Sequence, residues 1–273
     1  MRRCVIGIFL ALAIVGCGTE VRKEQAILEK LDQRADAQRD RDYERAALLS
    51  EEALALAEAK LGANHPLTSS TTMLLADSYD DWHRFDEAEQ SYRKALQLRQ
   101  ETLGREHPDS LTSMQQLSRF YYNRRRLDEA EPLAKETLSL RTQVLGSSHR
   151  DTIGSIVDLA NVIKLQRRPG DAEPLFLKAI SLSEKELGDN DSNTLTSMRE
   201  LGFFYYGQGR YDEAESIYLE TIKRGQSTLG IRHRSVIRFH EDLANVYQSQ
   251  GRLAEASKLR DQILELKRSG SPS

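Results

Sequence analysis

A short phrase recurs along the chain at a constant interval of 42 residues. It reads LGANHPLTS from Leu61 and LGREHPDSL from Leu103. Its glycine returns without insertion or deletion at Gly62, Gly104, Gly146, Gly188 and Gly230. The same step relates five leucines and five alanines: Leu75, Leu117, Leu159, Leu201 and Leu243, and Ala88, Ala130, Ala172, Ala214 and Ala256. Self-similarity at a fixed period in this range predicts that one structural unit stacks on the next.

The pattern within one period predicts two α-helices. Leu75 and Tyr79 have the i, i+4 spacing of one face of an amphipathic first helix. The recurring alanine of the second helix lets the two helices approach closely, because a larger side chain would overpack the seam. The chain is 39% hydrophobic and 30% charged, with a net charge of −3, which is typical of a helical protein with a well-solvated surface. We therefore predict an all-α fold.

The sequence also predicts where these helices begin and end. Gly104 is expected to end a second helix, because glycine readily adopts the left-handed backbone found there. Asp109 or Ser110 is expected to cap the following first helix with its side chain. Asp86, with Glu89 three residues later, is expected to begin a second helix as a capping box.

One period is similar to a known repeat family. Residues 118–152 read SRFYYNRRRLDEAEPLAKETLSLRTQVLGSSHRDT, with DEAEPL opening the second helix. Other periods carry the Leu-Ala…Tyr of the first helix (Leu75, Ala76 and Tyr79) and the LGxxHP element. This resembles the tetratricopeptide repeat in its 42-residue, kinesin-light-chain-like form, over residues 43–268. The resemblance implies a superhelical solenoid of about five full helix-turn-helix units over residues 62–268. It also implies that the first helices line a concave groove for an extended peptide or a partner helix.

A degenerate unit is expected at residues 22–61, ahead of the full repeats. The segment Asp42-Tyr43-Glu44-Arg45-Ala46 sits one period before Arg84-Phe85-Asp86-Glu87-Ala88. The preceding first helix carries Gln33, Arg34 and Ala37 where other units have a leucine, a small residue and a tyrosine. Polar substitution of this kind is typical of a terminal capping unit that faces solvent.

The first 17 residues, MRRCVIGIFLALAIVGC, are typical of a secretion signal. A basic start precedes an apolar stretch at residues 5–15, which is too short to span a membrane. The end resembles the bacterial lipobox, which implies removal of residues 1–16, lipidation of Cys17 and a tether over residues 17–21. An ordinary signal peptide cleaved elsewhere is the alternative. Glycine rather than aspartate after Cys17 favours the outer membrane over the inner. Residues 269–273, SGSPS, are expected to be a flexible tail.

Histidine recurs at one repeat position, at His65, His107, His149 and His233. A row of metal sites is one interpretation. Successive copies should lie about 10 Å apart, the distance between packed helices. A zinc ligand lies about 2 Å from its metal, so neighbouring copies cannot share an ion. We therefore interpret these residues as hydrogen-bonding loop positions and predict no metal site.

Arginine recurs in the same way, at Arg84, Arg126, Arg168, Arg210 and Arg252. A ladder for anions is one interpretation. The favoured one is structural: the arginines end first helices, at the negative end of the helix dipole, and pair with neighbouring carboxylates. The chain has no phosphate-binding glycine loop, HExxH or GxSxG motif, so neither an enzyme nor a cofactor is predicted.

The family groove, transferred by repeat register, identifies candidate partner-binding residues. They are Asp77, Arg119, Tyr122, Asn161, Lys164, Arg199, Phe203, Tyr206, Glu241 and Asn245. A merely solvated polar face is the alternative, but the three aromatic residues favour a binding surface. The related units usually place asparagine before the Leu-Ala pair, whereas this chain has acids at Asp158, Glu200 and Asp242. Three acids would repel an acidic peptide, so a neutral or basic segment is expected.

Together these features predict a scaffold of the bacterial cell envelope, anchored to the lipid bilayer through Cys17, that binds a protein partner in its groove. A self-associating structural lipoprotein, whose solenoid ends stack without a foreign peptide, is the alternative. The net negative charge gives no support for binding a nucleic acid.

Overall fold

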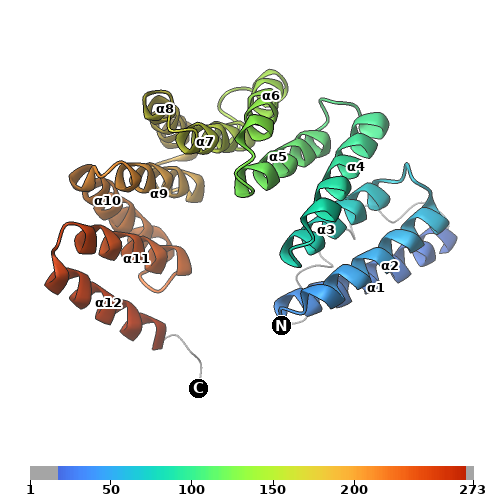
Figure 1. Cartoon of the computed structure of the whole chain (residues 1–273), viewed down its shortest axis with the longest axis horizontal. Coiled ribbons are helices and arrows are strands. Elements are labelled where there is room, and N and C mark those ends of the chain that lie inside the picture. Colours follow the sequence, from blue (N-terminus) through green and yellow to red (C-terminus); the bar gives the residue numbers. More distant parts are fainter. Residues whose placement is uncertain (1–17, 269–273) are drawn as a thin grey trace. The chain divides into compact units, whose positions relative to one another are not determined.

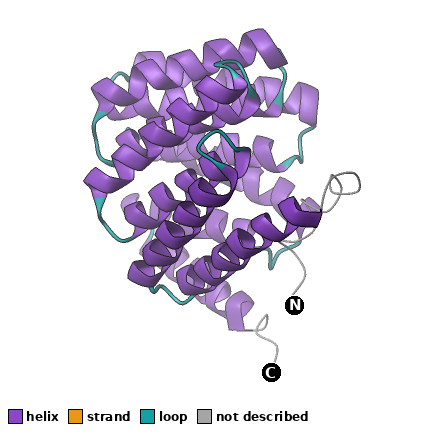
Figure 2. Cartoon of the chain, turned by 90° about the vertical axis from the view of Figure 1, so that its right-hand side faces the viewer, coloured by secondary structure: helices purple, strands orange, loops and turns teal. Residues whose placement is uncertain are grey.

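A computed structural model describes residues 18–268 of the chain. They form twelve α-helices joined by short loops, and no strand occurs among them (Figures 1 and 2). The N-terminal pair is α1 (Gly18–Arg39) and α2 (Tyr43–Leu61). The first helices that follow are α3 (Pro66–Asp81), α5 (Pro108–Asn123), α7 (Arg150–Leu165), α9 (Ser192–Gly207) and α11 (Arg234–Ser249). The second helices are α4 (Phe85–Leu103), α6 (Leu127–Leu145), α8 (Pro169–Leu187), α10 (Tyr211–Leu229) and α12 (Leu253–Arg268). The predicted all-α repeat fold is confirmed.

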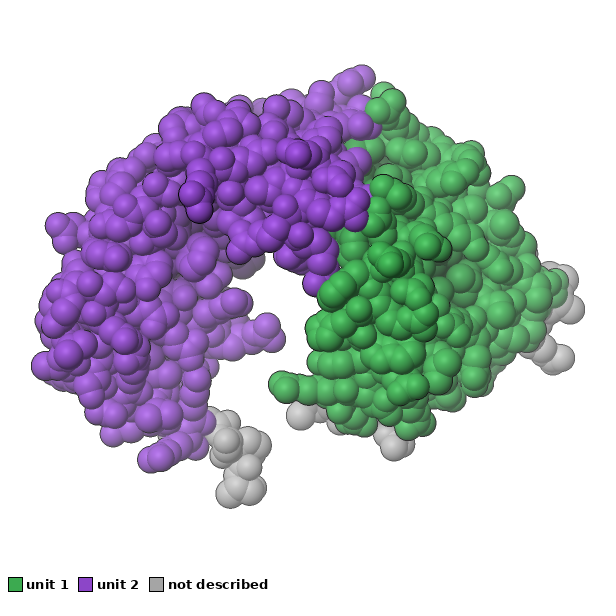
Figure 3. All heavy atoms as spheres, in the orientation of Figure 1, with its two compact units in different colours: residues 1–120 green, residues 121–273 purple. Residues whose placement is uncertain are grey.

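The helices belong to two compact units, coloured separately in Figure 3. Unit 1 ends at Phe120 and unit 2 begins at Tyr121, so the boundary falls near the end of α5. In unit 1, α1 packs on α2, α2 on α3 and α3 on α4. In unit 2, each helix from α6 to α12 packs on the next, and α9 also contacts both α7 and α11. Within each unit the helical hairpins therefore stack in chain order.

The recurring alanines form the seams within these stacks. All five, at positions 88, 130, 172, 214 and 256, are buried. Larger buried side chains then fill the spaces between hairpins, among them Tyr92 on α4, Phe176 on α8 and Tyr218 on α10, which occupy one repeat position. The close seam predicted from alanine is confirmed.

The N-terminal pair departs from the sequence prediction in two ways. α1 begins at Gly18, so residues 18–21 are helical rather than part of a tether. No proline interrupts this stretch, and nothing in it prevents the helix from extending toward the N-terminus. The predicted signal peptide at residues 1–16, the lipidation site Cys17 and the tail at residues 269–273 lie outside the described residues.

The prediction of a terminal capping unit required Arg34 to face solvent. In the structure Arg34 is buried, with 7% of its surface exposed. Its Nε donates to Ser78 Oγ at 3.0 Å and its Nη2 to the Leu74 carbonyl oxygen at 3.2 Å. A long cationic side chain at a position of small residues reaches across the seam and bonds to α3. The prediction was wrong because an arginine can lie buried when its donors find acceptors.

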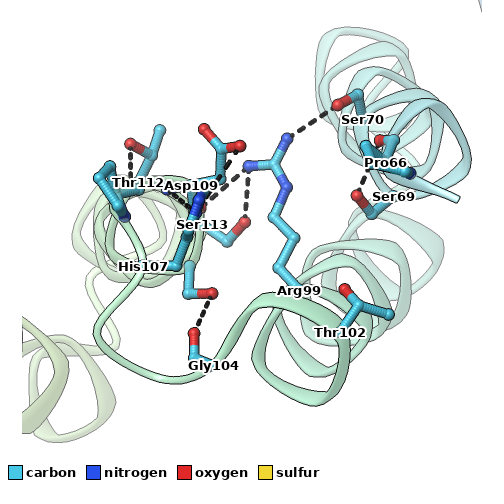
Figure 4. A network of polar contacts seen from close by, with 12 residues as sticks. Pro66, Ser69, Ser70, Arg99, Thr102, Gly104, His107, Asp109, Thr112 and Ser113 are labelled. Carbon is cyan, nitrogen blue, oxygen red and sulfur yellow. Dashed lines mark hydrogen bonds and ion pairs between the residues drawn. The ribbon is translucent and has the colours of Figure 1, made fainter. Parts of the chain in front are cut away.

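The recurring loop phrase joins α4 to α5 in unit 1 (Figure 4). Gly104 ends α4 with a φ of 94°, in the left-handed region that glycine tolerates, as predicted. Ser110 Oγ donates to the Gly104 carbonyl oxygen at 2.7 Å. His107 Nδ1 accepts from the backbone N–H of Asp109 at 3.2 Å. The capping side chain is therefore His107, and the prediction of Asp109 or Ser110 as the cap was wrong.

The same histidine position caps other first helices. His65, His149 and His233 each accept from the backbone N–H two residues later. Where the phrase lacks histidine, Asp191 accepts from the N–H of Asn193 at 2.8 Å with its carboxylate. The imidazole nitrogen thus accepts the same backbone hydrogen bond as the carboxylate of an aspartate N-cap. This confirms that the histidines are hydrogen-bonding loop residues.

Second helices begin differently from the prediction. The N-cap residues of α4, α6, α8 and α10 are the recurring arginines, and none makes a side-chain cap bond. Asp86, predicted to open α4 as part of a capping box, lies inside its first turn. Three residues are enough to turn the chain between a first and a second helix, because one of them is left-handed: His83, with a φ of 61°, or Gly209, with a φ of 73°.

The histidine cap makes a direct prediction. Replacing His149 with alanine removes the acceptor for the N–H of Asp151 and should lower the free energy of unfolding by about 0.5–2 kcal/mol. His149→Asp should keep most of the stability, because Asp191 already caps α9 in that way. Urea denaturation followed by circular dichroism measures both variants. Equal losses for alanine and aspartate would contradict the capping role.

Candidate partner-binding face

Neighbouring first helices in each unit lie side by side and share hydrogen bonds. In unit 1, Gln38 on α1 donates to Asp81 on α3 at 2.6 Å. In unit 2, Arg199 on α9 donates to Asp242 on α11 at 2.6 Å. Each pair is separated by 43 residues, one repeat and one residue. Side-chain hydrogen bonds therefore join α1 to α3 in unit 1 and α9 to α11 in unit 2.

The predicted binding residues divide between the units. Asp77 and Arg119 belong to unit 1 and the other eight to unit 2. Asp77 Oδ1 accepts from the hydroxyl of Tyr92 at 2.6 Å. Burial raises the pKa of Asp77, while the Tyr92 hydrogen bond and the charge of Arg34 oppose that rise. Asp77 is thus engaged in packing α3 against α4 rather than displayed. Arg119 is exposed.

We call the surface formed by the eight predicted residues of unit 2 the unit 2 face; its members are Tyr122, Asn161, Lys164, Arg199, Phe203, Tyr206, Glu241 and Asn245. Its largest apolar side chain is Phe203, which is 47% exposed although its helix, α9, packs on four others. Lys164 Nζ lies 4.8 Å from the centre of the Phe203 ring and 5.8 Å from that of Phe176. It donates to Asn161 Oδ1 at 2.5 Å.

Lys164 is half-buried at the centre of this face. Burial lowers the pKa of its ammonium group, and the nearby carboxylate of Glu200 opposes the shift. Tyr122 is influenced by the same carboxylate as Lys164. Burial raises the pKa of the Tyr122 hydroxyl, and the charges of Glu200 and Asp158 add to the rise. The structure therefore brings an aromatic ring, an amide and an ammonium group together from α7 and α9.

Arg199 on α9 pairs with two carboxylates on or beside this face. Its Nε bonds Asp242 at 2.6 Å, and its Nη1 lies 3.3 Å from Glu200 Oε1. Burial raises the pKa of Asp242, and the hydrogen bond from Arg199 opposes that rise. Two of the three acids that were expected to repel an acidic peptide are thus paired with one arginine. Asp158, the third, also has an interaction partner.

At the C-terminal edge, side chains of α12 contact the last two predicted residues. Lys267 Nζ lies 2.7 Å from Glu241 Oε1, and Arg260 Nη2 lies 3.4 Å from Asn245 Oδ1. Arg260 occupies the repeat position that holds the buried rings of Phe176 and Tyr218. Among the described residues no helix after α12 packs on this position, and Arg260 bonds Asn245 and Gln248 of α11.

Three of the recurring arginines, Arg168, Arg210 and Arg252, connect their repeat to the one before. Arg210 Nη1 lies 2.7 Å from Glu173, its Nε donates to Glu213 at 2.9 Å, and its guanidinium carbon lies 4.3 Å from the Tyr205 ring centre. Arg168 and Arg252 make matching pairs with a glutamate of the preceding repeat. The predicted pairing with carboxylates is confirmed. The predicted position was wrong, since these residues precede second helices rather than end first helices.

Three cations near the unit 2 face were not among the predicted residues: Arg125, Arg238 and Arg260. Arg238 lies one turn before Asp242 on α11, and its charge lowers the pKa of that carboxyl. Arg125 lies in the turn after α5, close enough for its charge to affect Lys164. The transferred register covered only the family's usual groove positions and did not include them.

Side-chain clusters and helix hydropathy within residues 18–268 bear on a metal site and on a membrane span. No three His, Cys, Asp or Glu side chains there come together in a way that could hold a metal ion. None of the helices in that range has the length and hydropathy needed to cross a bilayer.

Stacked helical hairpins of constant length define the chain as a helical-repeat protein. Models of the tetratricopeptide repeat match residues 35–101, 83–143, 152–193 and 193–269. The chain therefore belongs to the tetratricopeptide repeat family. No curated protein matches it.

Solved structures support the same fold. A protein from Podosopora anserina described as a kinesin light chain superposes with a TM-score of 0.65 at 22% identity, covering 75% of this chain and 96% of that one. BtubC from P. vanneervenii has a TM-score of 0.65 at 19% identity, covering 91% and 94%. A Rap protein complexed with competence and sporulation factor has a TM-score of 0.62 at 11% identity, covering 89% and 76%. At these identities the likeness concerns the fold alone.

Proposed function

We propose that the chain is a membrane-anchored scaffold that binds a partner peptide or helix on the unit 2 face. The observation that carries this proposal is Phe203, a large aromatic side chain left 47% exposed on a face bordered by Lys164, Asn161 and Arg199. Aromatic and arginine side chains contribute most to binding energy at protein interfaces. The structurally similar Rap protein, whose structure contains competence and sporulation factor, gives a precedent for ligand binding by this kind of fold.

The anchor is proposed from the sequence of residues 1–17. A basic start, a short apolar stretch and the Gly16-Cys17 ending fit a lipoprotein signal, so Cys17 would carry the acyl chains. Because α1 begins at Gly18, the helical repeat would start next to the lipid. The scaffold would then act in the bacterial cell envelope close to a bilayer, with the outer membrane favoured in a Gram-negative cell.

Crosslinking in native membranes tests this proposal. The partner crosslinked to the native chain should be recovered about tenfold less with Phe203→Ala, since loss of a binding hot spot costs about 2 kcal/mol. Leu219→Ala is the matched control, because Leu219 on α10 is also 47% exposed but lies outside the unit 2 face. Cys17→Ser should release the chain from the membrane fraction. Equal recovery with the Phe203 and Leu219 variants would contradict binding on this face.

Self-association is the second candidate, favoured by Leu264 on the end helix α12, which is 51% exposed. Arg260 and Lys267 lie on the same side of that helix, at i−4 and i+3, and would resist the stacking of two like-charged ends. Light scattering of the purified chain at several concentrations separates the candidates. A strict monomer at every concentration would contradict self-association.

A further inference from the structure

The two ends of the described repeats are α1 in unit 1 and α12 in unit 2. Inside each unit, the second helix of one repeat packs against the first helix of the next, as α2 does on α3 and α8 on α9. No helix among residues 18–268 packs in this way before α1 or after α12. Because the repeat has a constant period, the contacts at the internal junctions identify the positions of α1 and α12 that would meet if a second copy of the chain continued the stack.

One junction contact is a hydrogen bond from a buried guanidinium to a hydroxyl on the following first helix. It joins Arg99 Nη1 to Ser113 Oγ at 2.9 Å (Figure 4) and Arg141 Nη1 to Ser155 Oγ at 2.8 Å. At the ends of the array, the arginine position is held by Lys267 on α12 and the serine position by Glu29 on α1. A base and an acid therefore occupy the two sides of this contact.

A second junction contact is a pair of aromatic rings. The ring centres lie 5.3 Å apart at Tyr92 and Phe120, and 5.5 Å apart at Phe176 and Phe204. At the ends of the array, these two positions are held by Arg260 on α12 and Asp36 on α1. A base again lies on the C-terminal end and an acid on the N-terminal end. Polar ends that serve solubility alone do not need opposite charges at matching positions.

Two of these four charges form ion pairs within the chain, and both pairs are exposed. Lys267 Nζ lies 2.7 Å from Glu241 Oε1, and Asp36 pairs with Arg39 one turn away on α1. An exposed ion pair contributes little, because water and salt screen it. Lys267 and Asp36 can therefore exchange these partners for a carboxylate or an ammonium group of a second copy at little cost.

The other two charges have no ion-pair partner among residues 23–268. Arg260 bonds only side-chain amides of α11, and Glu29 accepts only from the amide of Gln25, at 3.3 Å. Leu264, between Arg260 and Lys267 on α12, is 51% exposed. It holds the repeat position of two buried isoleucines, Ile180 and Ile222. A helix packed on this end would remove Leu264 from water, which favours association.

We propose that α12 of one chain stacks on α1 of a second copy in the register of the repeat, with Lys267 against Glu29 and Arg260 against Asp36. This deepens self-association, the second candidate above, and rests on it. Two unlike ends meet, so the repulsion between two basic ends does not arise. The contact is heterologous, and each added copy leaves one free end of either kind, so assembly can continue beyond a dimer. The unit 2 face takes no part in it.

Sedimentation equilibrium of the full chain, in density-matched detergent at low salt and several concentrations, tests the proposal. The native chain should associate. Lys267→Glu and Glu29→Lys should each weaken the association constant about tenfold or more, because each places like charges opposite one another. The chain that carries both substitutions should recover to within about threefold of the native constant, because the reversed pair attracts again.

Lys258→Glu is the matched control for Lys267→Glu, because it changes the net charge equally. Lys258 is exposed on α12 at the repeat position of Ser216, which stays exposed on α10 although a further repeat follows. The control should change association by less than about twofold, since salt screens a charge outside the contact.

Three results would overturn the inference. Association that neither end variant weakens, or a combined variant no better than the single ones, would place self-association on another surface. A strict monomer at every concentration would remove self-association as well as this interface. Recovery in the combined variant, with Lys258→Glu unaffected, would support the stacking of unlike ends.

Discussion

Replacing Phe176 with alanine should lower the free energy of unfolding by about 3–5 kcal/mol, the range for truncating a buried phenylalanine. Phe176 on α8 is 0% exposed, and its ring centre lies 5.5 Å from that of Phe204 on the next first helix. The substitution removes an aromatic contact between two hairpins and leaves a cavity in a buried part of the structure. Urea denaturation, followed by circular dichroism, measures the loss.

The adjacent residue provides the control for this prediction. Leu177 lies on the same helix and is 48% exposed, so Leu177→Ala removes apolar atoms from the surface without making a cavity. Its effect should stay within about 0.5 kcal/mol. A loss for Phe176→Ala no greater than that for Leu177→Ala would show that the space between the α7–α8 and α9–α10 hairpins is not tightly packed.

Gly202→Ala should lower the free energy of unfolding by about 1–3 kcal/mol, although alanine is the better helix former. Gly202 lies inside α9, where the added Cβ would be 2.7 Å from Ile217 Cγ2 and 2.8 Å from the Tyr218 ring. Both neighbours belong to α10, so the helices of this hairpin must separate or the buried Tyr218 must move. Thermal unfolding by circular dichroism measures the effect.

Gly154→Ala is the matched control, because Gly154 lies inside another first helix, α7, and its Cβ would meet nothing within 4 Å. Without a clash, only the helix propensity changes, and this variant should gain about 0.5–1 kcal/mol. A loss of stability at Gly202 together with a gain at Gly154 would distinguish the effect of the packing clash from that of helix propensity. A gain at both positions would show that the α9–α10 seam can relax by a few tenths of an ångström.

Much of the fold follows from local rules that repeat. The period, the two helices per unit and the alanine seam depend on residues within one repeat. Ala88 and Ala172 are buried by the helix next to them in the chain. Helix ends were predicted less well. Gly104 ends α4 as expected, but the cap at His107 was missed because imidazole is not a usual cap residue.

The candidate face shows the limit of such reasoning. Register placed Lys164, Phe203 and Arg199 on one face, and the structure keeps them there. It did not show that Arg199 bonds Asp242 or that side chains of α12 bond Glu241 and Asn245, since those partners come from other helices. The expectation of a neutral or basic partner counted the acids on this face without Arg199, which pairs with both Glu200 and Asp242.

The sequence alone therefore determined the repeat, the helical hairpin and the residues that share a face, because these depend on spacing within one unit. Tertiary structure alone decided which charges on that face are neutralised. Lys164 and Asp158 are both charged residues of α7, but only the distances between side chains on neighbouring helices show that Lys164 lacks an ion-pair partner. The energy of a charge depends on its distance to the counter-charge and on its burial, and neither quantity is local in the chain.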